Sequence, residues 1–193
     1  MRIKTLTGPA LTDALDDVAR LRLAVFRDWP YLYAGDFDYE RRYLEVYEQS
    51  SRAIVVAVYD GDWMVGAATA APLAEHADAF FDAFAGTTIN IDACFYCGES
   101  VLLPRFRGQG YGHSFFDLRE DHARALGYRQ MCFASVVRAP NHPLRPSAYR
   151  SLEPFWEGRG YSRMPGVIAH FAWKDVDQAG ETEKPLQFWI KDL

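Results

Sequence analysis

Six consecutive residues that include three glycines form the stretch of this sequence best suited to bind an anion. The stretch runs from Arg107 to Gly112, between an apolar run that ends at Leu103 and a helical pattern that begins near Tyr111. Glycine lets the backbone approach a ligand closely because it has no Cβ. The N–H groups at a helix start, together with the helix dipole, favour negative charge. A glycine turn between a strand and a helix therefore predicts a site for a phosphate group.

Three known phosphate-binding patterns compete for this turn. A P-loop ends in Gly-Lys-Ser/Thr, which does not follow here. A dinucleotide fingerprint requires a third glycine where His113 stands, and an acidic residue at the end of the next strand, where residues 133–136 read Phe-Ala-Ser-Val. The third pattern, Arg/Gln-x-x-Gly-x-Gly/Ala, fits without a gap. A dinucleotide-dependent oxidoreductase is thus the weaker alternative, and a comparison of NAD with CoA binding would separate the two.

The third pattern resembles the pyrophosphate loop of the GCN5-related N-acetyltransferases, a family that uses acetyl-CoA. Members often read Pro-x-aromatic-Arg-Gly-x-Gly-x-Gly, and residues 104–112 read Pro-Arg-Phe-Arg-Gly-Gln-Gly-Tyr-Gly. Many members also carry an aromatic pair followed by Gly-aromatic, and this chain has Phe155-Trp156 and Gly160-Tyr161. The resemblance covers residues 94–173 by motif and the rest of the chain by the order of its elements.

The resemblance implies a site for acetyl-CoA as co-substrate, with no metal. It implies that the loop N–H groups hold the pyrophosphate and that the exposed backbone of the preceding strand pairs with the pantetheine arm. Family members often place an asparagine after the next strand against that arm, although the one here, beside His142-Pro143, equally suits a turn. The expected cofactor-binding residues are Leu102, Leu103, Arg107, Gly108, Gln109, Gly110, Tyr111, Gly112 and Asn141.

Acetyl transfer to an amine also requires a base that takes the proton of the ammonium group. Glu99 is the first candidate, because it lies on the strand leading to the loop, where some family members place a catalytic glutamate. Burial would raise its pKa. A structural ion pair is the competing interpretation, and a register shift of one residue would put Ser100 in the cleft instead. His142 is a second candidate base.

The proton donor for the departing thiolate is where the sequence departs from the family. The usual donor is a tyrosine in the aromatic pair, but Trp156 stands there. An indole N–H donates a hydrogen bond and is not an acid at neutral pH. Tyr149, in a helix expected over residues 147–156, is the candidate replacement, and water is the alternative. The missing tyrosine also leaves open a different class of function, a non-enzymatic acyl-CoA-binding or regulatory module.

Aromatic and acidic residues are interleaved in the segment that joins the first two expected helices. In the family this segment overhangs the acceptor cleft, and aromatic rings with carboxylates suit a cationic amine of a small molecule or peptide. The same residues also suit a core with an acidic rim. Three arginines leave an acidic acceptor open, or would serve the 3′-phosphate of the cofactor. The aromatic residues are Phe26, Trp29, Tyr31, Tyr33, Phe37 and Tyr39, and the arginines are Arg138, Arg145 and Arg150.

The elements that position these residues follow from the apolar periodicity, which predicts the order β-α-α-β-β-β-α-β-α-β-β. We expect a single α/β domain over residues 1–193, with a mostly antiparallel, splayed mixed sheet flanked by helices and an extra short helix near residues 75–85. The other expected helices cover residues 11–23, 39–47, 111–126 and 147–156, and the strands cover residues 2–6, 53–59, 63–70, 95–103, 128–137, 167–173 and 186–190.

Composition narrows the class of protein. The net charge is -5 with no run of lysine or arginine, so we expect no nucleic-acid partner and no anionic membrane partner. Neither a signal segment nor a membrane-spanning stretch is predicted. The 3 cysteines, an odd number, favour buried reduced thiols in the cytoplasm over a redox pair or a zinc site. The acceptor, the acyl length and the oligomeric state, a homodimer included, stay open.

Overall fold

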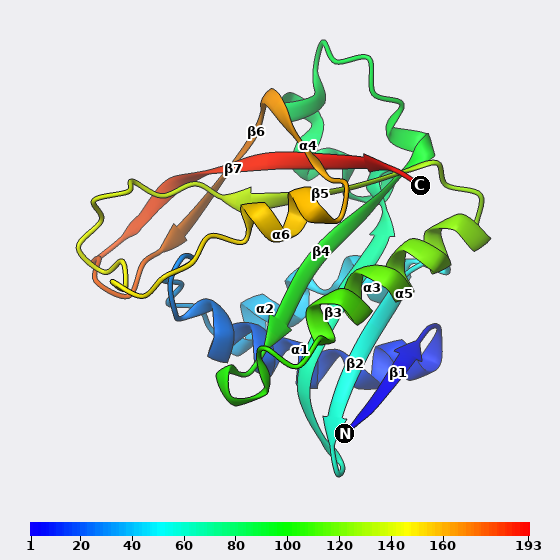
Figure 1. The fold of residues 1–193 in the computed structure, drawn as a ribbon, viewed down its shortest axis with the longest axis horizontal. Coiled ribbons are helices and arrows are strands. Elements are labelled where there is room, and N and C mark those ends of the chain that lie inside the picture. The colour runs from blue at the N-terminus through cyan, green and yellow to red at the C-terminus, as the bar shows by residue number, and fades with distance from the viewer.

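The structure is a computed structural model that describes the backbone of residues 1–193 and every side chain except those of residues 77, 78, 79 and 81. Seven strands form one sheet in the order β1-β2-β3-β4-β5-β7-β6 (Figure 1). All neighbouring strands are antiparallel except β4 and β5. The strands are β1 (Arg2–Leu6), β2 (Ile54–Asp60), β3 (Trp63–Pro72), β4 (Cys94–Leu102), β5 (Gln130–Val136), β6 (Ser162–Lys174) and β7 (Glu181–Asp192). This confirms the expected splayed mixed sheet.

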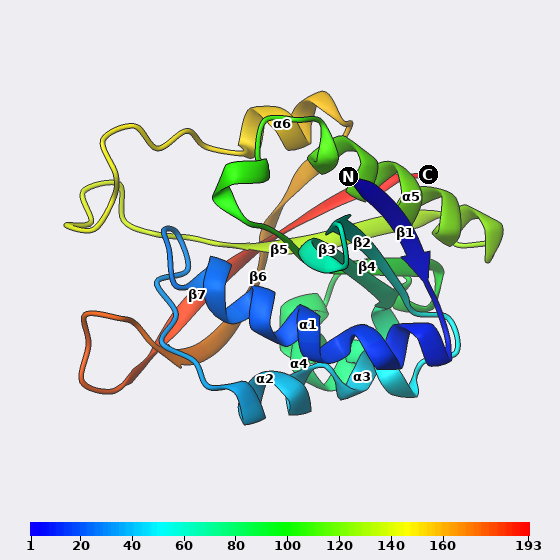
Figure 2. The ribbon, with the colours of Figure 1, turned by 90° about the horizontal axis from the view of Figure 1, so that it is seen from below.

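Helices cover both faces of the sheet. The helices α1 to α4 lie on one face, and α5 and α6 lie on the other (Figure 2). Strand β2 shows why both faces are filled, because its apolar residues contact the core on each side in alternation: Val55 packs with the α1 cluster and Val56 with the α5 cluster. The helices are α1 (Pro9–Phe26), α2 (Phe37–Tyr43), α3 (Glu45–Gln49), α4 (Ala77–Phe84), α5 (Tyr111–Ala125) and α6 (Glu153–Gly158).

The parallel pair β4 and β5 separates after a short contact. Their pairing covers three residue pairs, from Cys94 with Gln130 to Tyr96 with Cys132. Beyond this point β4 follows β3 and β5 follows β7, so the two strands diverge (Figure 1). The sheet therefore opens along the second half of β4, the half that leads to the glycine loop.

Two predicted helices have different bounds in the structure. The helix expected over residues 39–47 is divided at Leu44, which ends α2 and precedes α3. The helix expected over residues 147–156 is wrong in its first half, since α6 begins at Glu153 with Pro154 in its first turn. Proline lacks an N–H and fits the first turn of a helix, so Pro154 marks the start of this helix and not its end.

The remaining elements agree with the prediction, with longer strands at the C-terminal end. The extra helix near residues 75–85 is confirmed as the 3₁₀ turn Leu73–His76 followed by α4. Strands β6 and β7 extend past their apolar runs because a hairpin pairs backbone groups whatever side chains they carry. All three cysteines are buried thiols, with Cys94 and Cys97 inside strand β4. Within the described residues, no helix combines the length and apolar character needed to cross a bilayer.

Candidate functional site

The glycine loop has the backbone conformation of an anion site. Gly108 and Gly110 have φ values of 75° and 87°, in the left-handed region that favours glycine, and Gly110 directly precedes α5. Among the described residues, the N–H groups of residues 108–112 donate to no protein acceptor. A Cβ on Gly110 would meet open space. The residues therefore fit a pyrophosphate: consecutive N–H groups at a helix N-terminus next to unfilled space.

The end of the strand that leads into this loop lies next to the opening of the sheet. The side chains of Leu102 and Leu103 pack against the core, and the Leu103 N–H donates to Val65 O at 3.0 Å. The Arg107 Nε donates to Leu102 O at 3.0 Å, so this arginine caps the strand end in the present structure. The side chains of both leucines are thus occupied in the core, and the pairing of their backbone with a cofactor arm stays a prediction.

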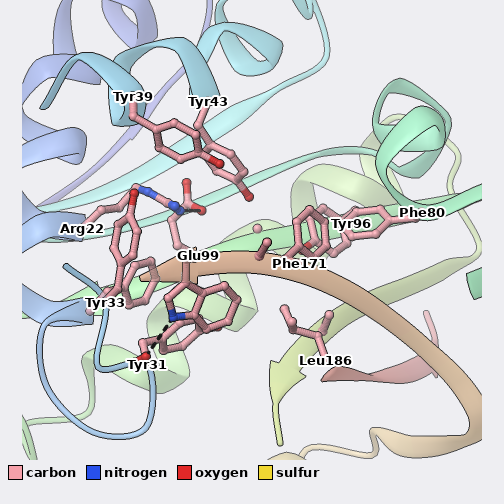
Figure 3. Close-up of a pocket in the computed structure, with 15 residues that line it drawn as sticks. Arg22, Tyr31, Tyr33, Tyr39, Tyr43, Phe80, Tyr96, Glu99, Phe171 and Leu186 are labelled. Atoms are coloured by element: carbon pink, nitrogen blue, oxygen red, sulfur yellow. Dashed lines mark hydrogen bonds and ion pairs between the residues drawn. The ribbon is translucent and has the colours of Figure 1, made fainter. Parts of the chain in front are cut away.

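A cavity of about 90 Å³ lies where β4 and β5 separate, on the face covered by α1 and α2 (Figure 3). Its walls come from α1, the segment before α2, α2 itself, α4, and strands β4 to β7. The residues that line it are Arg22, Phe26, Tyr31, Tyr33, Tyr39, Tyr43, Phe80, Tyr96, Gly98, Glu99, Ala134, Phe171, Ala172, Trp173 and Leu186. Glu99 lies between Arg22 and the aromatic side chains that face it (Figure 3).

A β-bulge directs Glu99 into this cavity. Two residues of β4, Gly98 and Glu99, face the single residue Thr69 of β3. The flanking pairs are Ala68 with Ser100 and Ala70 with Cys97. Side chains alternate along a strand, so strict alternation from Tyr96 would place Ser100 in the cavity, whereas the extra residue puts Glu99 there. Ser100 instead accepts a hydrogen bond on the opposite face of the sheet, from Arg119 at 2.9 Å.

Neighbouring side chains hold the bulge on the cavity face. Thr69 Oγ1 donates to Glu99 Oε1 at 3.0 Å and accepts from the Glu99 N–H at 3.3 Å. Tyr47, fully buried, lies over Gly98, where a Cβ would overlap both the Tyr47 hydroxyl and Thr69 Oγ1. Gly98 is therefore the residue that permits this close approach.

Glu99 belongs to a buried group of one guanidinium and two carboxylates. Arg22 donates to Glu99 through one N–H and to Glu40 through another, and all three residues are buried. Burial raises the pKa of Glu99 above its ordinary value, the positive charge of Arg22 and the Thr69 hydrogen bond oppose that rise, and Glu40 adds to it. The group carries more negative than positive charge when both carboxylates are ionised. Glu99 is thus a buried carboxylate whose pKa lies above its ordinary value and whose charge depends on its two neighbours.

A second buried arginine holds the same bulge from the opposite face. Arg119 of α5 is fully buried, and its NH1 donates to Thr69 O at 3.0 Å and to Glu99 O at 3.1 Å. Its Nε donates to Phe115 O at 2.9 Å. The helix whose N-terminus forms the glycine loop therefore also fastens the backbone that carries Glu99.

The other sequence-predicted candidates lie outside the residues that line the cavity. Tyr149 and His142 both contact Trp29, with ring centroids 5.8 Å and 5.2 Å from it. Asn141 is exposed in a turn after β5. The expected placement of Tyr149 one helical step before Trp156 is wrong, because α6 starts after it. Its role as proton donor and the cofactor contact of Asn141 stay predictions.

Trp156, which stands where family members usually have a tyrosine, is packed among other aromatic side chains. Its ring lies 5.0 Å from that of Phe133 and 5.3 Å from that of Trp189. Phe155 packs on the first turn of α5, with its ring 4.9 Å from that of His113. Phe155 therefore joins α6 to the helix that carries the glycine loop, and Trp156 joins α6 to strands β5 and β7.

Several residues of the site escaped the sequence analysis. Arg22 had a readable signal: Leu11, Leu15, Val18 and Arg22 share the buried face of α1 at helical spacing, and a charged residue on such a face requires a buried partner. Phe171 and Trp173 carried no such signal. Of the three arginines considered for the ligand, Arg138 is committed elsewhere, because it forms an ion pair with the buried Asp175 at 2.6 Å and donates to Pro30 O.

Comparison with known proteins places the chain in a family. The profile of the acetyltransferase (GNAT) family matches residues 18–150. The chain therefore belongs to this family, whose general activity is acetyl transfer. A search of curated proteins finds no match.

Solved structures agree at the level of the fold. A ribosomal-protein-alanine N-acetyltransferase from Brucella melitensis is 14% identical, with 100% of each chain covered and a TM-score of 0.58. An aminoglycoside 6′-N-acetyltransferase in complex with coenzyme A is 18% identical, with 100% of this chain and 97% of that chain covered and a TM-score of 0.57. The yncA protein of Salmonella typhimurium, solved with acetyl-CoA, is 13% identical over 100% and 95% of the two chains, with a TM-score of 0.58.

Proposed function

We propose that this protein transfers the acetyl group of acetyl-CoA to a primary amine by direct attack in a ternary complex, with Glu99 as the general base. The amine nitrogen forms a bond to the acetyl carbon while the carbon–sulfur bond breaks. The first proton of the ammonium group goes to the Glu99 carboxylate before the attack, the second leaves the nitrogen for water as the amide forms, and the sulfur takes up a proton from water or from a donor such as Tyr149.

The observation that carries the proposal is the position of Glu99. It is buried, has a raised pKa, and is directed by a bulge into the cavity where the parallel strands separate. A carboxylate in this environment accepts a proton more readily at neutral pH than one in water. Its ion pair with Arg22 also gives Glu99 a structural role, and the experiment below distinguishes this role from that of a general base.

The cofactor is assigned to the opening and the loop next to it. In this proposal the N–H groups of residues 108–112 bind the pyrophosphate, and the backbone of Leu102 and Leu103 pairs with the pantetheine arm. The unused N–H groups of the loop support this, as does acetyl-CoA in a solved structure of the same fold. Three buried thiols favour a reducing compartment, so we place the activity in the cytoplasm.

The test compares Glu99→Gln with Glu40→Gln. Both variants remove one buried carboxylate from Arg22, but only Glu99 lines the cavity. For Glu99→Gln we expect turnover to fall by roughly 10²- to 10⁴-fold with an unchanged dissociation constant for acetyl-CoA. The wild-type rate should climb with pH to a plateau as Glu99 loses its proton, and this limb should disappear in Glu99→Gln.

The matched control gives the result expected of a structural role. Glu40→Gln should lower the melting temperature and leave the plateau rate of the folded fraction close to wild type, with the pH limb still present but moved to lower pH, because Glu40 no longer raises the pKa of Glu99. If both variants change the melting temperature and neither changes the rate or its pH profile, Glu99 is a structural ion pair and the assignment of the base is wrong.

A further inference from the structure

The cavity beside Glu99 has walls of aromatic rings. Nine of its 15 lining residues are aromatic, and four of the others are Gly98, Ala134, Ala172 and Leu186. Aromatic faces carry partial negative charge and attract ammonium groups, and they also stack on flat apolar groups. The small residues leave width for a ring between these walls. The aromatic residues are Phe26, Tyr31, Tyr33, Tyr39, Tyr43, Phe80, Tyr96, Phe171 and Trp173.

The charges around the cavity favour a cation over an anion. Arg22 and Glu99 are its only charged lining residues in the described part of the chain, and Arg22 already holds two carboxylates. The nearby Lys184 Nζ lies 3.5 Å from the buried Asp175, which also binds Arg138. An acceptor that brings a carboxylate or phosphate would therefore add negative charge to a group that already has an excess of it.

The tyrosines contribute polarity without charge. Burial raises the pKa of Tyr31 to about 12 and raises that of Tyr96 well above its ordinary value. Both phenols therefore keep their protons at neutral pH and act as neutral hydrogen-bonding groups. They do not supply the positive charge that an anionic acceptor would need.

From these observations we infer that the acceptor is a small primary amine on an aromatic or similarly flat apolar carrier without an anionic group. The inference rests on the proposed acetyl transfer, and it narrows the acceptor from amines in general to this class. The ammonium group lies against Glu99, and the carrier lies between the rings on the side of Phe171 and Tyr96 (Figure 3).

The test uses three amines that differ in one property each: phenethylamine, phenylalanine, which adds a carboxylate, and butylamine, which lacks the ring. We expect kcat/KM for phenethylamine to exceed that for phenylalanine by about a hundredfold and that for butylamine by at least about tenfold. The readout is free CoA thiol with acetyl-CoA saturating.

A cavity variant and a surface variant test the location. Phe171 lines the cavity without touching the Arg22 ion pairs, and Phe171→Leu should reduce the preference for phenethylamine over butylamine by at least about tenfold. Trp63, the first residue of β3, is 81% exposed, and Trp63→Leu should leave the preference unchanged.

The outcomes separate this inference from the proposed function. Equal or better turnover of phenylalanine overturns the inference and leaves acetyl transfer standing. A preference for phenethylamine that survives Phe171→Leu places the acceptor elsewhere and also overturns the inference. If acetyl-CoA raises the melting temperature but a broad amine panel gives no thiol, the proposed function itself is wrong and the protein is an acyl-CoA-binding module.

Discussion

Two buried arginines, Arg22 and Arg119, flank one β-bulge from opposite faces of the sheet, and their charges are compensated differently. Arg22 faces the cavity and binds the carboxylates of Glu99 and Glu40. Arg119 faces the α5 core, and its partners are backbone carbonyls and the Ser100 hydroxyl. The carboxylates that pair with Arg22 can be protonated, so that arrangement depends on pH. The partners of Arg119 are hydrogen-bonding groups that hold the backbone in place. Arg119 therefore holds the backbone of the bulge on the α5 face, and Arg22 influences the pKa of Glu99 on the cavity face.

The largest effect should follow from Arg22→Met, which leaves two buried carboxylates without their cation. We expect a loss of about 3–5 kcal/mol in the free energy of unfolding at neutral pH. The loss should shrink on acidification: the pKa of Glu99 is raised in the folded state, so its protonation stabilises the fold as pH falls through that value. Urea unfolding of variant and wild type at pH 7.5 and pH 5 measures the difference. A loss that is the same at both pH values would contradict the charge-based account of Arg22.

Arg119→Met should cost less and show no such recovery. It leaves buried carbonyls of Thr69 and Glu99 without a donor, for about 2–3 kcal/mol. Because carboxylates are not its partners, the difference from wild type should not depend on pH. Arg124→Met on the same helix removes an exposed ion pair with Asp121 and a longer one with Glu120, which keeps Arg159 and Lys191 as partners, and should change stability by less than about 1 kcal/mol. In the folded fraction Arg119→Met should also lower turnover and broaden the pH profile, since the backbone of Glu99 loses the hydrogen bond that holds it in place.

A third buried group, His76, extends the comparison to a titratable side chain without an ionic partner. Burial lowers the pKa of His76 to about 4, and its Nε2 has no hydrogen-bond partner among the described residues. The unfolded chain therefore binds this proton first, so stability present above about pH 6.5 is lost as pH falls toward 4. His76→Leu should abolish this loss. The free energy of unfolding of the variant, minus that of wild type, should therefore be about 2 kcal/mol larger at pH 5 than at pH 7.5. Thermal unfolding across this range would contradict the account if the two curves stayed parallel.

The smallest effect on free energy is expected in the glycine loop, where the site consists of backbone. Gly110→Val adds a side chain at a φ of 87° and next to the predicted pyrophosphate. Affinity for acetyl-CoA should fall by at least tenfold, about 1.4 kcal/mol, while Phe106 and the α5 core stay packed. Calorimetric titration with acetyl-CoA, with NAD as a control ligand, measures the change. Normal binding by the folded variant would show that the loop is assigned wrongly.

The glycine loop and the cavity also differ in how far the sequence predicted them. Residues 104–112 are contiguous, and their conformation follows from local rules: glycines where φ is positive and a helix that begins at Tyr111. The order of the elements along the chain, the extra helix and the splayed mixed sheet followed from apolar periodicity and the family resemblance. The prediction of a helix over residues 147–156 was wrong because proline either ends a helix or occupies its first turn, and Pro154 lies in the first turn of α6.

Sequence alone determined that Glu99 is a carboxylate on the strand before an anion-binding turn. Only the tertiary structure decided where it points, because the bulge depends on Thr69 and Tyr47, which lie 30 and 52 residues away along the chain. The same holds for the cavity, whose walls come from eight elements and segments between Arg22 and Leu186. Periodicity reports which face of an element is apolar, but not which distant faces meet. The conformation of the glycine loop could be predicted because it depends on neighbouring residues, whereas the cavity beside Glu99 could not because it depends on long-range packing.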